Sequence, residues 1–516
     1  MYNSILNKFN IDYLLVCSTN QYLVEYPSLK ENARYTLTGF TGSTGDALLT
    51  KDGIYLFVDG RYHTQADHEA NKGVTVVKLK IGQKQDDEIK KLIDSHKVMG
   101  IVAKKISQKR LEGFSEYNIK LLEDDPINNY TEEHSLNDVI QVGKPIFYKP
   151  AMPTFVTNLE EVSYLTAKRD FSKDCSSKIW SKLFINTDGS QKIFNDDKEC
   201  SEFLRTFDGE IIVDKSKINA FDYALIKSPI NKTSEISMMK SIKSNSELEA
   251  YKKAFEATDK TMMAIRSYIE NNSNLSEYDI AKRLREEFIN FGAKSLSFNS
   301  IVAINQNSAL AHYSKNSKDV FLTEGSLVLI DCGAYYAEGL ATDITRVFVK
   351  GEPNELQKEV YTTVLKAFLN SYNYISNTLF LKQKTTEDDV FSVKRENGLI
   401  TGFEIDTLAH SILDNKIDGF VFGHGLGHGI GINVHEAPPN LSQNEIAKAK
   451  ILDGMTFTIE PGLYNANHFG IRLENSCFMQ NGKIHSFVKM GYEGKLINYN
   501  MLSEQEIEWL KGFVIL

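Results

Sequence analysis

Apolar residues recur along the chain with spacings that change twice, which divides it into three zones with different predicted elements. In the first zone, short apolar runs predict strands. Between two of them, Lys51-Asp52-Gly53 predicts a hairpin turn with glycine at positive φ. The predicted strands are 13–17, 47–50 and 54–58. Residues 86–95 and 109–123 have the spacing of helices, so this zone mixes the two element types.

The second zone, roughly 145 to 235, carries a weaker version of the same pattern. A strand at 183–185, an Asp188-Gly189 turn and a strand at 193–194 repeat the order of the first hairpin. From these residues alone, two interpretations stay open. One is an internal duplication, and the other is two unrelated hairpins in α/β surroundings.

The third zone begins near residue 240 and alternates long helices with strands. Ser244 precedes Glu247 with the spacing of a capping box, which predicts a helix over 247–271, and Ser276 with Asp279 starts a second helix. Further strands are predicted at 300–304, 327–330 and 344–349, and further helices at 355–375 and 404–414. This interleaving favours α+β packing over a doubly wound parallel sheet.

Composition and charge narrow the classes of function. The 516 residues suggest two to four domains, and 42% hydrophobic with 25% charged residues is ordinary for a globular protein. A net charge of −9 argues against a nucleic-acid partner. The five cysteines are scattered without CxxC spacing, which fits a reducing compartment. With no signal peptide and no apolar run near the roughly 20 residues that span a bilayer, we expect a cytoplasmic protein without a membrane partner.

Two aspartates stand at strand ends in the third zone. An apolar strand runs directly into Asp331, and a second strand begins just after Asp343, so a tight hairpin would bring both carboxylates to one end of a sheet. Buried carboxylates need partners, because an unpaired one costs several kcal/mol. Either residue taken alone is more simply read as a capping or salt-bridged aspartate.

A glycine-rich stretch, 423–436, contains three histidines: His424, His428 and His435. The glycines permit close backbone approach and unusual φ values, as loops around a reacting centre often require. His424 and His428 have the spacing of a zincin helix, but the intervening glycines disfavour a helix and no glutamate follows His424. Because the three histidines cluster among glycines, a functional role for them is favoured over a structural one.

A third group of polar residues follows two later strands. Glu460 precedes a Pro-Gly turn, and strand alternation places Arg472 and Glu474 on one face. With Asp331 and Asp343, these glutamates make four carboxylates, whose formal charge two divalent cations would cancel. Carboxylates suit Mn²⁺, Mg²⁺ or Ca²⁺, and one imidazole shifts the preference toward Mn²⁺, Co²⁺ or Zn²⁺.

The motifs DCG, TDITR, HGLGHGIG, IEPG and RLEN resemble those of the pita-bread metallopeptidases, which include methionine aminopeptidase, aminopeptidase P and prolidase. The resemblance implies that two divalent metal ions per chain, preferably Mn with Co or Zn as alternatives, are held by five ligands. These are Asp331, Asp343, His428, Glu460 and Glu474. It also implies that Asp343 and Glu474 bridge the metals, that Asp331 completes one, and that His428 with Glu460 completes the other.

Within this group, the chain is most similar to the three-domain aminopeptidase P type. The motifs that carry this likeness are Thr38 to Gly45, Val58 to Tyr62, and the two segments 297–302 and 307–313. The implied fold class is α+β: a C-terminal pita-bread domain, 239–516, preceded by two smaller creatinase-like α/β domains, 1–140 and 141–238. This likeness favours the duplication of the second zone. Relatives of this type often dimerise, so a homodimer is expected.

The same resemblance assigns further site residues. Substrate-binding positions are Phe298, His312, His435 and Arg472, and catalytic positions are His312, His424, His435, Glu460 and Arg472. The implied activity releases the N-terminal residue from peptides with proline in second position. The nucleophile would be a hydroxide that bridges the two metals. A prolidase-like X-Pro dipeptidase and a non-catalytic pita-bread binding protein are the alternatives.

Overall fold

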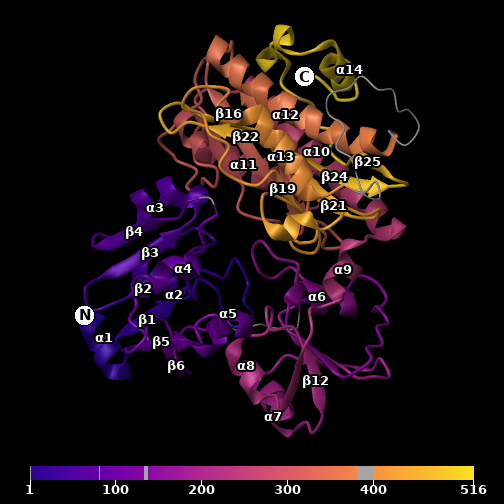
Figure 1. Cartoon of the computed structure of the whole chain (residues 1–516). Helices are drawn as coiled ribbons and strands as arrows, with labels where there is room; N and C mark the ends of the chain where they lie inside the picture. Colours follow the sequence, from indigo (N-terminus) through magenta and orange to yellow (C-terminus); the bar gives the residue numbers. More distant parts are fainter. Residues whose placement is uncertain (1, 81, 133–137, 381–399) are drawn as a thin grey trace, which may run out of the picture. The chain divides into compact units, whose positions relative to one another are not determined.

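The computed structural model describes residues 2–80, 82–132, 138–380 and 400–516. The chain folds as two compact units. One comprises Met1–Lys168 with Ile179–Glu235, and the other comprises Arg169–Lys178 with Ile236–Leu516. We call the first the leading unit and the second the catalytic unit, because the second contains the residues that the sequence predicts to be catalytic. Figure 1 labels the elements of both units.

The leading unit contains a mixed sheet with the strand order β4-β3-β2-β1-β5-β6. Its strands are β1 (Tyr13–Val16), β2 (Ala47–Leu49), β3 (Ile54–Val58), β4 (Val74–Lys78), β5 (Val98–Val102) and β6 (Asn118–Leu122). Its helices are α1 (Tyr2–Phe9), α2 (Ala33–Thr38), α3 (His63–Glu69), α4 (Gln85–Lys90) and α5 (Gln108–Glu112), with short 3-10 turns at Gly60–Tyr62 and Ala103–Lys105. Apolar side chains from both faces of the sheet are buried, including Leu14 and Leu15.

A second sheet of the same unit has the order β11-β10-β8-β12-β13. Its elements are β8 (Thr154–Val156), α6 (Leu159–Thr166), β10 (Lys182–Ile185), β11 (Gln191–Phe194), α7 (Asp197–Thr206), β12 (Glu210–Val213), α8 (Ala220–Leu225) and β13 (Ser228–Asn231). Two short strands, β7 (Val139–Gln141) and β9 (Lys168–Asp170), lie outside both sheets. Strand directions match β3-β2-β1-β5-β6 of the first sheet: two antiparallel pairs followed by two parallel pairs. This shared topology supports duplication over two unrelated hairpins.

Two details of the leading unit differ from the sequence predictions. The β2–β3 hairpin forms, but Gly53 does not take a positive φ. Instead, the Thr50 hydroxyl accepts from the backbone N–H groups of Asp52 and Gly53. The helix predicted over 109–123 was wrong beyond Gly113, which caps α5. The following residues form β6 because they pair in parallel with β5, a long-range interaction that overrides local spacing.

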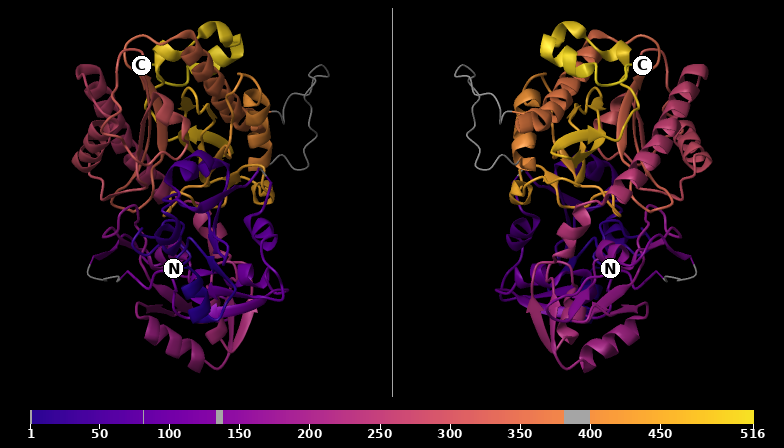
Figure 2. Two further views of the ribbon diagram at one scale, coloured as in Figure 1. Left: turned by 90° about the vertical axis from the view of Figure 1, so that its left-hand side faces the viewer. Right: turned by 90° about the vertical axis from the view of Figure 1, so that its right-hand side faces the viewer.

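The helices of the catalytic unit agree with their start signals. Capping boxes at Ser244 and Ser276 begin α10 (Asn245–Asn271) and α11 (Glu277–Asn290). The other helices are α9 (Ile236–Ser241), α12 (Glu355–Phe380), α13 (Gly402–Leu413) and α14 (Glu504–Leu510), with 3-10 turns at Asn305–Ala309, Glu445–Lys448, Gly494–Leu496 and Tyr499–Met501. Helix α12 packs against α13 and α14, which lie beside it in Figures 1 and 2.

Short antiparallel sheets fill the space among these helices. The strands are β14 (Ser295–Leu296), β15 (Ile301–Ile304), β16 (Leu327–Cys332), β17 (Ala334–Tyr335), β18 (Ile344–Val349), β19 (Gly427–His428), β20 (Asn440–Leu441), β21 (Thr456–Ile459), β22 (Gly462–Tyr464), β23 (Gly470–Arg472), β24 (Asn475–Gln480) and β25 (Lys483–Ser486). They form the sheets β15-β16-β18, β21-β24-β25, β14-β17, β19-β20 and β22-β23. Strands β16 and β18 pair as expected, but not through a tight hairpin, because β17 intervenes and pairs with β14.

One large apolar core joins these sheets to α12 and α13, with Val364, Ile405 and Phe457 fully buried. In the described part of the chain, no helix is both long and apolar enough to cross a bilayer. The mixture of helices and short antiparallel sheets is the α+β class predicted for this region. It places several strand ends side by side, and these carry the polar residues described next.

Candidate metal centre

Strand pairing positions the carboxylates of the catalytic unit. Asp331 lies in β16 opposite Thr345 of β18, and Asp343 comes directly before β18. Glu460 and Glu474 follow and precede two strands, β21 and β24, that pair with each other, so they lie at the same sheet end. The backbone N–H of Glu474 donates to the carbonyl of Thr345 over 3.2 Å, which joins the two strand systems.

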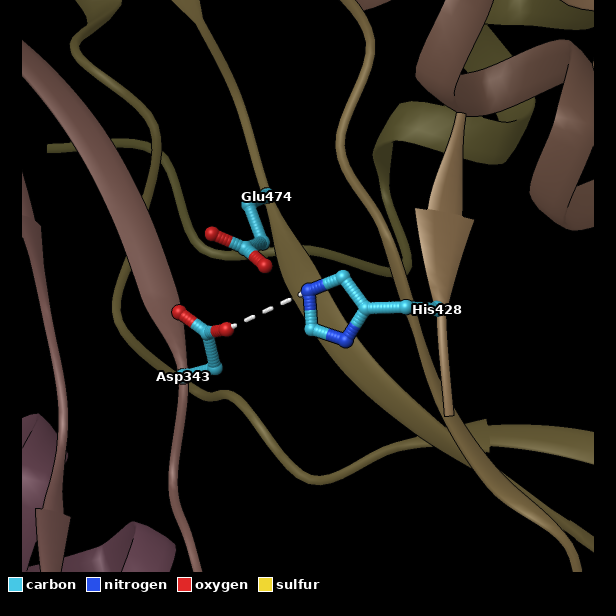
Figure 3. Close-up of side chains that lie close together, drawn as sticks. All are labelled: Asp343, His428 and Glu474. Carbon is cyan, nitrogen blue, oxygen red and sulfur yellow. Dashed lines mark ion pairs between the residues drawn. The ribbon is translucent and has the colours of Figure 1, made fainter. Parts of the chain in front are cut away.

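Asp343 and Glu474, which directly precede β18 and β24, and His428 of β19 point toward one another (Figure 3). One ligand atom of each lies within 4.8 Å of the others, the arrangement of a candidate metal site among the described residues. His428 Nε2 is 3.6 Å from Asp343 Oδ2 and 3.2 Å from Glu460 Oε1. The structure therefore brings these four predicted ligands together.

The hydrogen bonds of His428 determine which ring nitrogen faces the carboxylates. Its Nδ1 lies 3.1 Å from the carbonyl oxygen of Gly429, and because a carbonyl only accepts, Nδ1 carries the proton. Nε2 of the neutral ring is then an acceptor that faces the carboxylate of Glu460. Two acceptors at this distance need a positive charge between them, either a proton on Nε2 or a metal ion.

The pKa values of the four carboxylates are shifted in different directions. Burial, then repulsion from neighbouring carboxylates, raises the pKa of Asp343 and of Glu474 well above their usual range. Burial likewise raises the pKa of Asp331, although Arg472 opposes the shift. Burial also acts to raise the pKa of Glu460, but the hydrogen bond and charge of His428, with His424 and Arg472, outweigh it and lower this pKa to about 2. Three of the four carboxylates thus lack enough positive charge from the protein itself.

Arg472 lies at the centre of a buried hydrogen-bond network. Its Nη2 is 2.5 Å from Asp331 Oδ2, its Nε donates to Thr345 Oγ1 over 3.1 Å, and its Nη1 donates to Tyr464 Oη over 2.7 Å. Thr345 Oγ1 in turn donates to Glu474 Oε2 over 2.7 Å. The guanidinium therefore fixes the orientation of two predicted ligands, Asp331 directly and Glu474 through Thr345.

Sequence reasoning missed Thr345 and Tyr464. Burial raises the pKa of Tyr464 to about 12, so its hydroxyl stays protonated; it accepts from Arg472 and lies 2.8 Å from His424 Nε2. His424 Nδ1 lies 2.8 Å from the carbonyl of Gly425, so hydrogen bonds run in one direction from Arg472 to this carbonyl. For Thr345 a signal was present in the sequence, because it stands two residues after Asp343, the spacing of residues on one strand face. Tyr464 had no such signal, because the Pro461-Gly462 turn separates β21 from its own strand, β22.

The remaining predicted residues lie around this cluster. The His435 ring meets that of His428 edge to face at 4.4 Å between centroids. Phe298 packs on a small apolar cluster that includes Val434, next to His435. His312 is partly buried and follows Ala311, whose carbonyl accepts from Arg472 over 3.3 Å.

The donor set fits divalent metal ions. Asp331 Oδ1 and Glu474 Oε1 are buried and have no hydrogen-bond partner among the described residues, and Glu474 is only 1% exposed. Unpaired buried carboxylate oxygens beside further carboxylates and an imidazole lone pair are the ligands that Mn²⁺, Co²⁺ or Zn²⁺ accept. Fold and site together define a metal-dependent hydrolase.

Comparison with known proteins agrees with this class. Residues 249–481 match the model of metallopeptidase family M24, and residues 3–121 match the creatinase/prolidase N-terminal domain. The chain therefore carries a creatinase-type domain ahead of a region that matches the M24 metallopeptidases. Both features were predicted from the motifs of the chain.

Individual relatives are similar over nearly the whole chain. It is 25% identical to Xaa-Pro aminopeptidase 1 of Dictyostelium discoideum, an alignment covering 97% of this chain and 88% of the relative. It is 24% identical to aminopeptidase P2 of Arabidopsis thaliana, covering 98% and 82%. The crystal structure of a Caenorhabditis elegans X-prolyl aminopeptidase, described as cytosolic with a di-nuclear active site, has the same fold. Its TM-score is 0.80 at 19% identity, over 97% of this chain and 90% of that one.

Proposed function

We propose that the chain is a metal-dependent aminopeptidase that releases the N-terminal residue from peptides with proline in the second position. The observation that carries the proposal is the convergence of buried Asp343 and Glu474 with partly buried His428, one ligand atom of each lying within 4.8 Å of the others. The chain that holds them is similar over 97% of its length to a protein named Xaa-Pro aminopeptidase 1. A metal centre would supply the positive charge that these carboxylates lack within the protein. The similarity to a named Xaa-Pro aminopeptidase supports peptides with proline in the second position as substrates.

The five ligands would hold two divalent ions, preferably Mn²⁺, with Co²⁺ or Zn²⁺ as alternatives. Asp343 and Glu474 would help to hold both ions, Asp331 would complete the site of one, and His428 with Glu460 would complete the site of the other. When bound, such ions supply Lewis-acid chemistry, because they lower the pKa of water and polarise the scissile carbonyl. In support, Asp331 Oδ1 and Glu474 Oε1 are buried oxygens without hydrogen-bond partners among the described residues.

The remaining steps belong to side chains of the protein. Glu460 accepts a proton from the attacking water and passes it on, because its carboxylate lies among the ligands, with Oε1 3.2 Å from His428 Nε2. His435, whose ring meets His428, stabilises the oxyanion of the tetrahedral intermediate. His312 assists departure of the proline nitrogen, and Phe298 supplies an apolar surface for the proline ring.

Arg472 and His424 take part through the network that joins them. Arg472 holds Asp331, and Tyr464 links its guanidinium to His424. In this role the two residues orient the metal ligands and the side chains that face the substrate.

We further infer domain boundaries at 1–140, 141–238 and 239–516, a homodimer and a cytoplasmic location. Two sheets of equal topology in the leading unit support the first two boundaries. A related structure from C. elegans is described as a cytosolic enzyme, which supports the location. Analytical ultracentrifugation of the full chain tests the dimer, since a single species with the mass of one chain would contradict it.

The test of the proposed function is hydrolysis by the metal-stripped and Mn²⁺-reconstituted protein of three matched peptides: X-Pro-Y, X-Pro and X-Ala-Y. We expect metal-dependent release of X from X-Pro-Y, with much slower cleavage of the other two. Cleavage of X-Ala-Y at an equal rate would contradict the proline preference. No metal-dependent cleavage of any peptide would contradict the hydrolytic function.

A dipeptidase is the second candidate, because 241 residues of the chain are 35% identical to the Xaa-Pro dipeptidase of Pyrococcus horikoshii. That alignment covers only 47% of this chain and 60% of the relative, whereas the aminopeptidase relatives align almost throughout. Faster cleavage of X-Pro than of X-Pro-Y would favour the dipeptidase.

A further inference from the structure

The segment Arg169–Lys178 lies in sequence among elements of the leading unit but belongs to the catalytic unit. Within that unit it contacts two loops. Arg169 Nε donates to the carbonyl of Glu338 over 3.1 Å, and Ser177 Oγ lies 2.7 Å from the carbonyl of Gly339 and 3.3 Å from that of Ile432. The segment therefore links the loop that precedes Asp343 with the loop that carries His435.

Its last residue reaches the His435 loop through a side-chain relay. The ammonium of Lys178 donates to Asn433 Oδ1 over 2.8 Å, and Asn433 Nδ2 donates to the carbonyl of His435 over 2.9 Å. A lysine ammonium only donates and a carbonyl only accepts, so the orientation of the Asn433 amide is determined by its two partners. Lys178 is 7% exposed and Asn433 is 9% exposed, so water competes little for these bonds.

A second anchor holds the other side of the same loop. Glu436 follows His435 directly, and its Oε1 lies 3.2 Å from the ammonium groups of both Lys240 and Lys243. Its Oε2 accepts from the backbone N–H of Ile432 over 2.8 Å. The backbone of His435 is thus fixed from two directions.

We propose that Lys178 is a positioning residue for His435, acting through Asn433. The inference rests on the proposed function, in which His435 stabilises the oxyanion. Loss of the ammonium leaves the buried amide oxygen of Asn433 without this donor and loosens one of the two anchors. Because His435 would act in the transition state, its displacement lowers kcat and leaves KM nearly unchanged. A displacement of about 1 Å can cost on the order of 10²-fold in rate.

The test compares four variants of the Mn²⁺-loaded full chain on X-Pro-Y: Lys178→Met, Lys178→Arg, Asn433→Ala and the double variant Lys178→Met with Asn433→Ala. We expect each of the two single truncations to lower kcat about 10- to 100-fold, with bound metal unchanged. The double variant should fall no further than either truncation, because both break one relay. Lys178→Arg keeps a donor and should recover most of the loss. Asp174→Asn is the matched control, since Asp174 lies exposed on the same segment.

Two kinetic results would overturn the proposal. One is a kcat for Lys178→Met within about twofold of the wild type, and the other is a double variant whose losses multiply. If Lys178→Met does not fold, Asn433→Ala decides, since it breaks the same relay while keeping the lysine.

A readout independent of activity separates this inference from the proposed function. In the full chain labelled at its histidines, the ring signal of His435 is assigned by its absence in His435→Gln. We expect that signal to shift or broaden in Lys178→Met and in Asn433→Ala, but not in Asp174→Asn. An unchanged signal in both truncations contradicts the positioning role, even if the wild type proves inactive on X-Pro-Y.

Discussion

Two buried groups of charged side chains in the catalytic unit differ in how their carboxylates are compensated. In one, Glu436 is 4% exposed, and both Lys240 and Lys243 lie 3.2 Å from it. Burial acts to raise its pKa, but the two lysines outweigh this and lower the pKa to about 2. In the other, burial and mutual repulsion raise the pKa of Asp343 and Glu474.

The difference distinguishes a structural charge cluster from a binding site. Around Glu436 the protein provides its own counter-charges, so the cluster is complete and stabilises a loop. Around the four ligand carboxylates it provides Arg472 and an imidazole, which leaves excess negative charge in a buried space. Such an arrangement is stable only when further positive charge arrives, as protons or as metal ions.

The largest expected effect comes from breaking the ligand cluster. Asp343→Asn or Glu474→Gln removes a proposed bridging charge, and we expect hydrolysis of X-Pro-Y to fall by on the order of 10³-fold or more. Bound metal, measured by mass spectrometry, should fall with it. Asp259→Asn is the control, a buried aspartate of the same unit whose carboxylate accepts from the backbone N–H groups of Lys489 and Met490. Near-normal turnover by a metal-loaded Asp343→Asn protein would rule out the two-metal scheme.

Breaking the self-compensated cluster should affect folding instead. Glu436→Gln leaves two lysines buried without their shared carboxylate, and we expect the free energy of unfolding to fall by about 3–5 kcal/mol. Urea denaturation near neutral pH measures this change. Glu249→Gln is the comparison, because Glu249 pairs with Lys252 on an exposed helix surface and should change stability by less than about 1 kcal/mol. An equal decrease in the free energy of unfolding in Glu436→Gln and Glu249→Gln would contradict a stabilising role of the buried Glu436 cluster.

The two clusters should also give opposite pH dependences of stability in the metal-free protein. Asp343 and Glu474 have raised folded-state pKa values, so their contribution is complete below the ordinary values of 3.8 and 4.5 and is lost as pH rises through the folded-state values. Glu436 has the reverse sign. Its contribution is present above its ordinary pKa of 4.5 and is lost as pH falls toward 2.

Thermal unfolding at about pH 5 and about pH 8 measures this dependence. We expect added Mn²⁺ to raise the Tm more at the higher pH, where it replaces protons at the ligand carboxylates. In Asp343→Asn this difference between the two pH values should shrink. An equal rise in Tm at both pH values in the wild type would show that these carboxylates are already ionised without metal.

The smallest expected effect comes from the network between the ligands and His424. Tyr464→Phe removes the hydroxyl that joins Arg472 to His424, and we expect kcat to fall roughly tenfold with bound metal unchanged. Tyr372→Phe is the control, since its hydroxyl donates to the backbone carbonyl of Ile484 in β25 and not to a residue of the ligand network. Loss of metal from Tyr464→Phe would mean that the network holds the ligand cluster together and does not merely orient it.

Elements with local signals could be predicted from the sequence. The capping boxes at Ser244 and Ser276 begin helices in the structure, and the Asp188-Gly189 turn joins two paired strands. Asp343, His428 and Glu474, widely separated in the chain, were predicted as one set and do converge. The roles assigned to the individual site residues stay predictions, since convergence does not by itself define a role.

Features that depend on distant parts of the chain could not be predicted in this way. Strand β6 exists because it pairs with β5, and its own residues have the spacing of a helix. The membership of Arg169–Lys178 in the catalytic unit is set by contacts with residues far away in the sequence, such as those of Arg169 with Glu338 and Lys178 with Asn433. Charge compensation is equally non-local, because Lys240 and Glu436 are neighbours only in the folded chain.

The measurement that tests the central claim most directly is the metal stoichiometry of the full chain. Equilibrium dialysis of metal-stripped protein against Mn²⁺, followed by mass spectrometry of the bound metal, gives the number of ions per chain. We predict two bound ions in the wild type and fewer in Glu474→Gln, with hydrolysis of X-Pro-Y rising as the sites fill. Saturation at one ion or none, with undiminished X-Pro-Y hydrolysis, would contradict a two-metal centre.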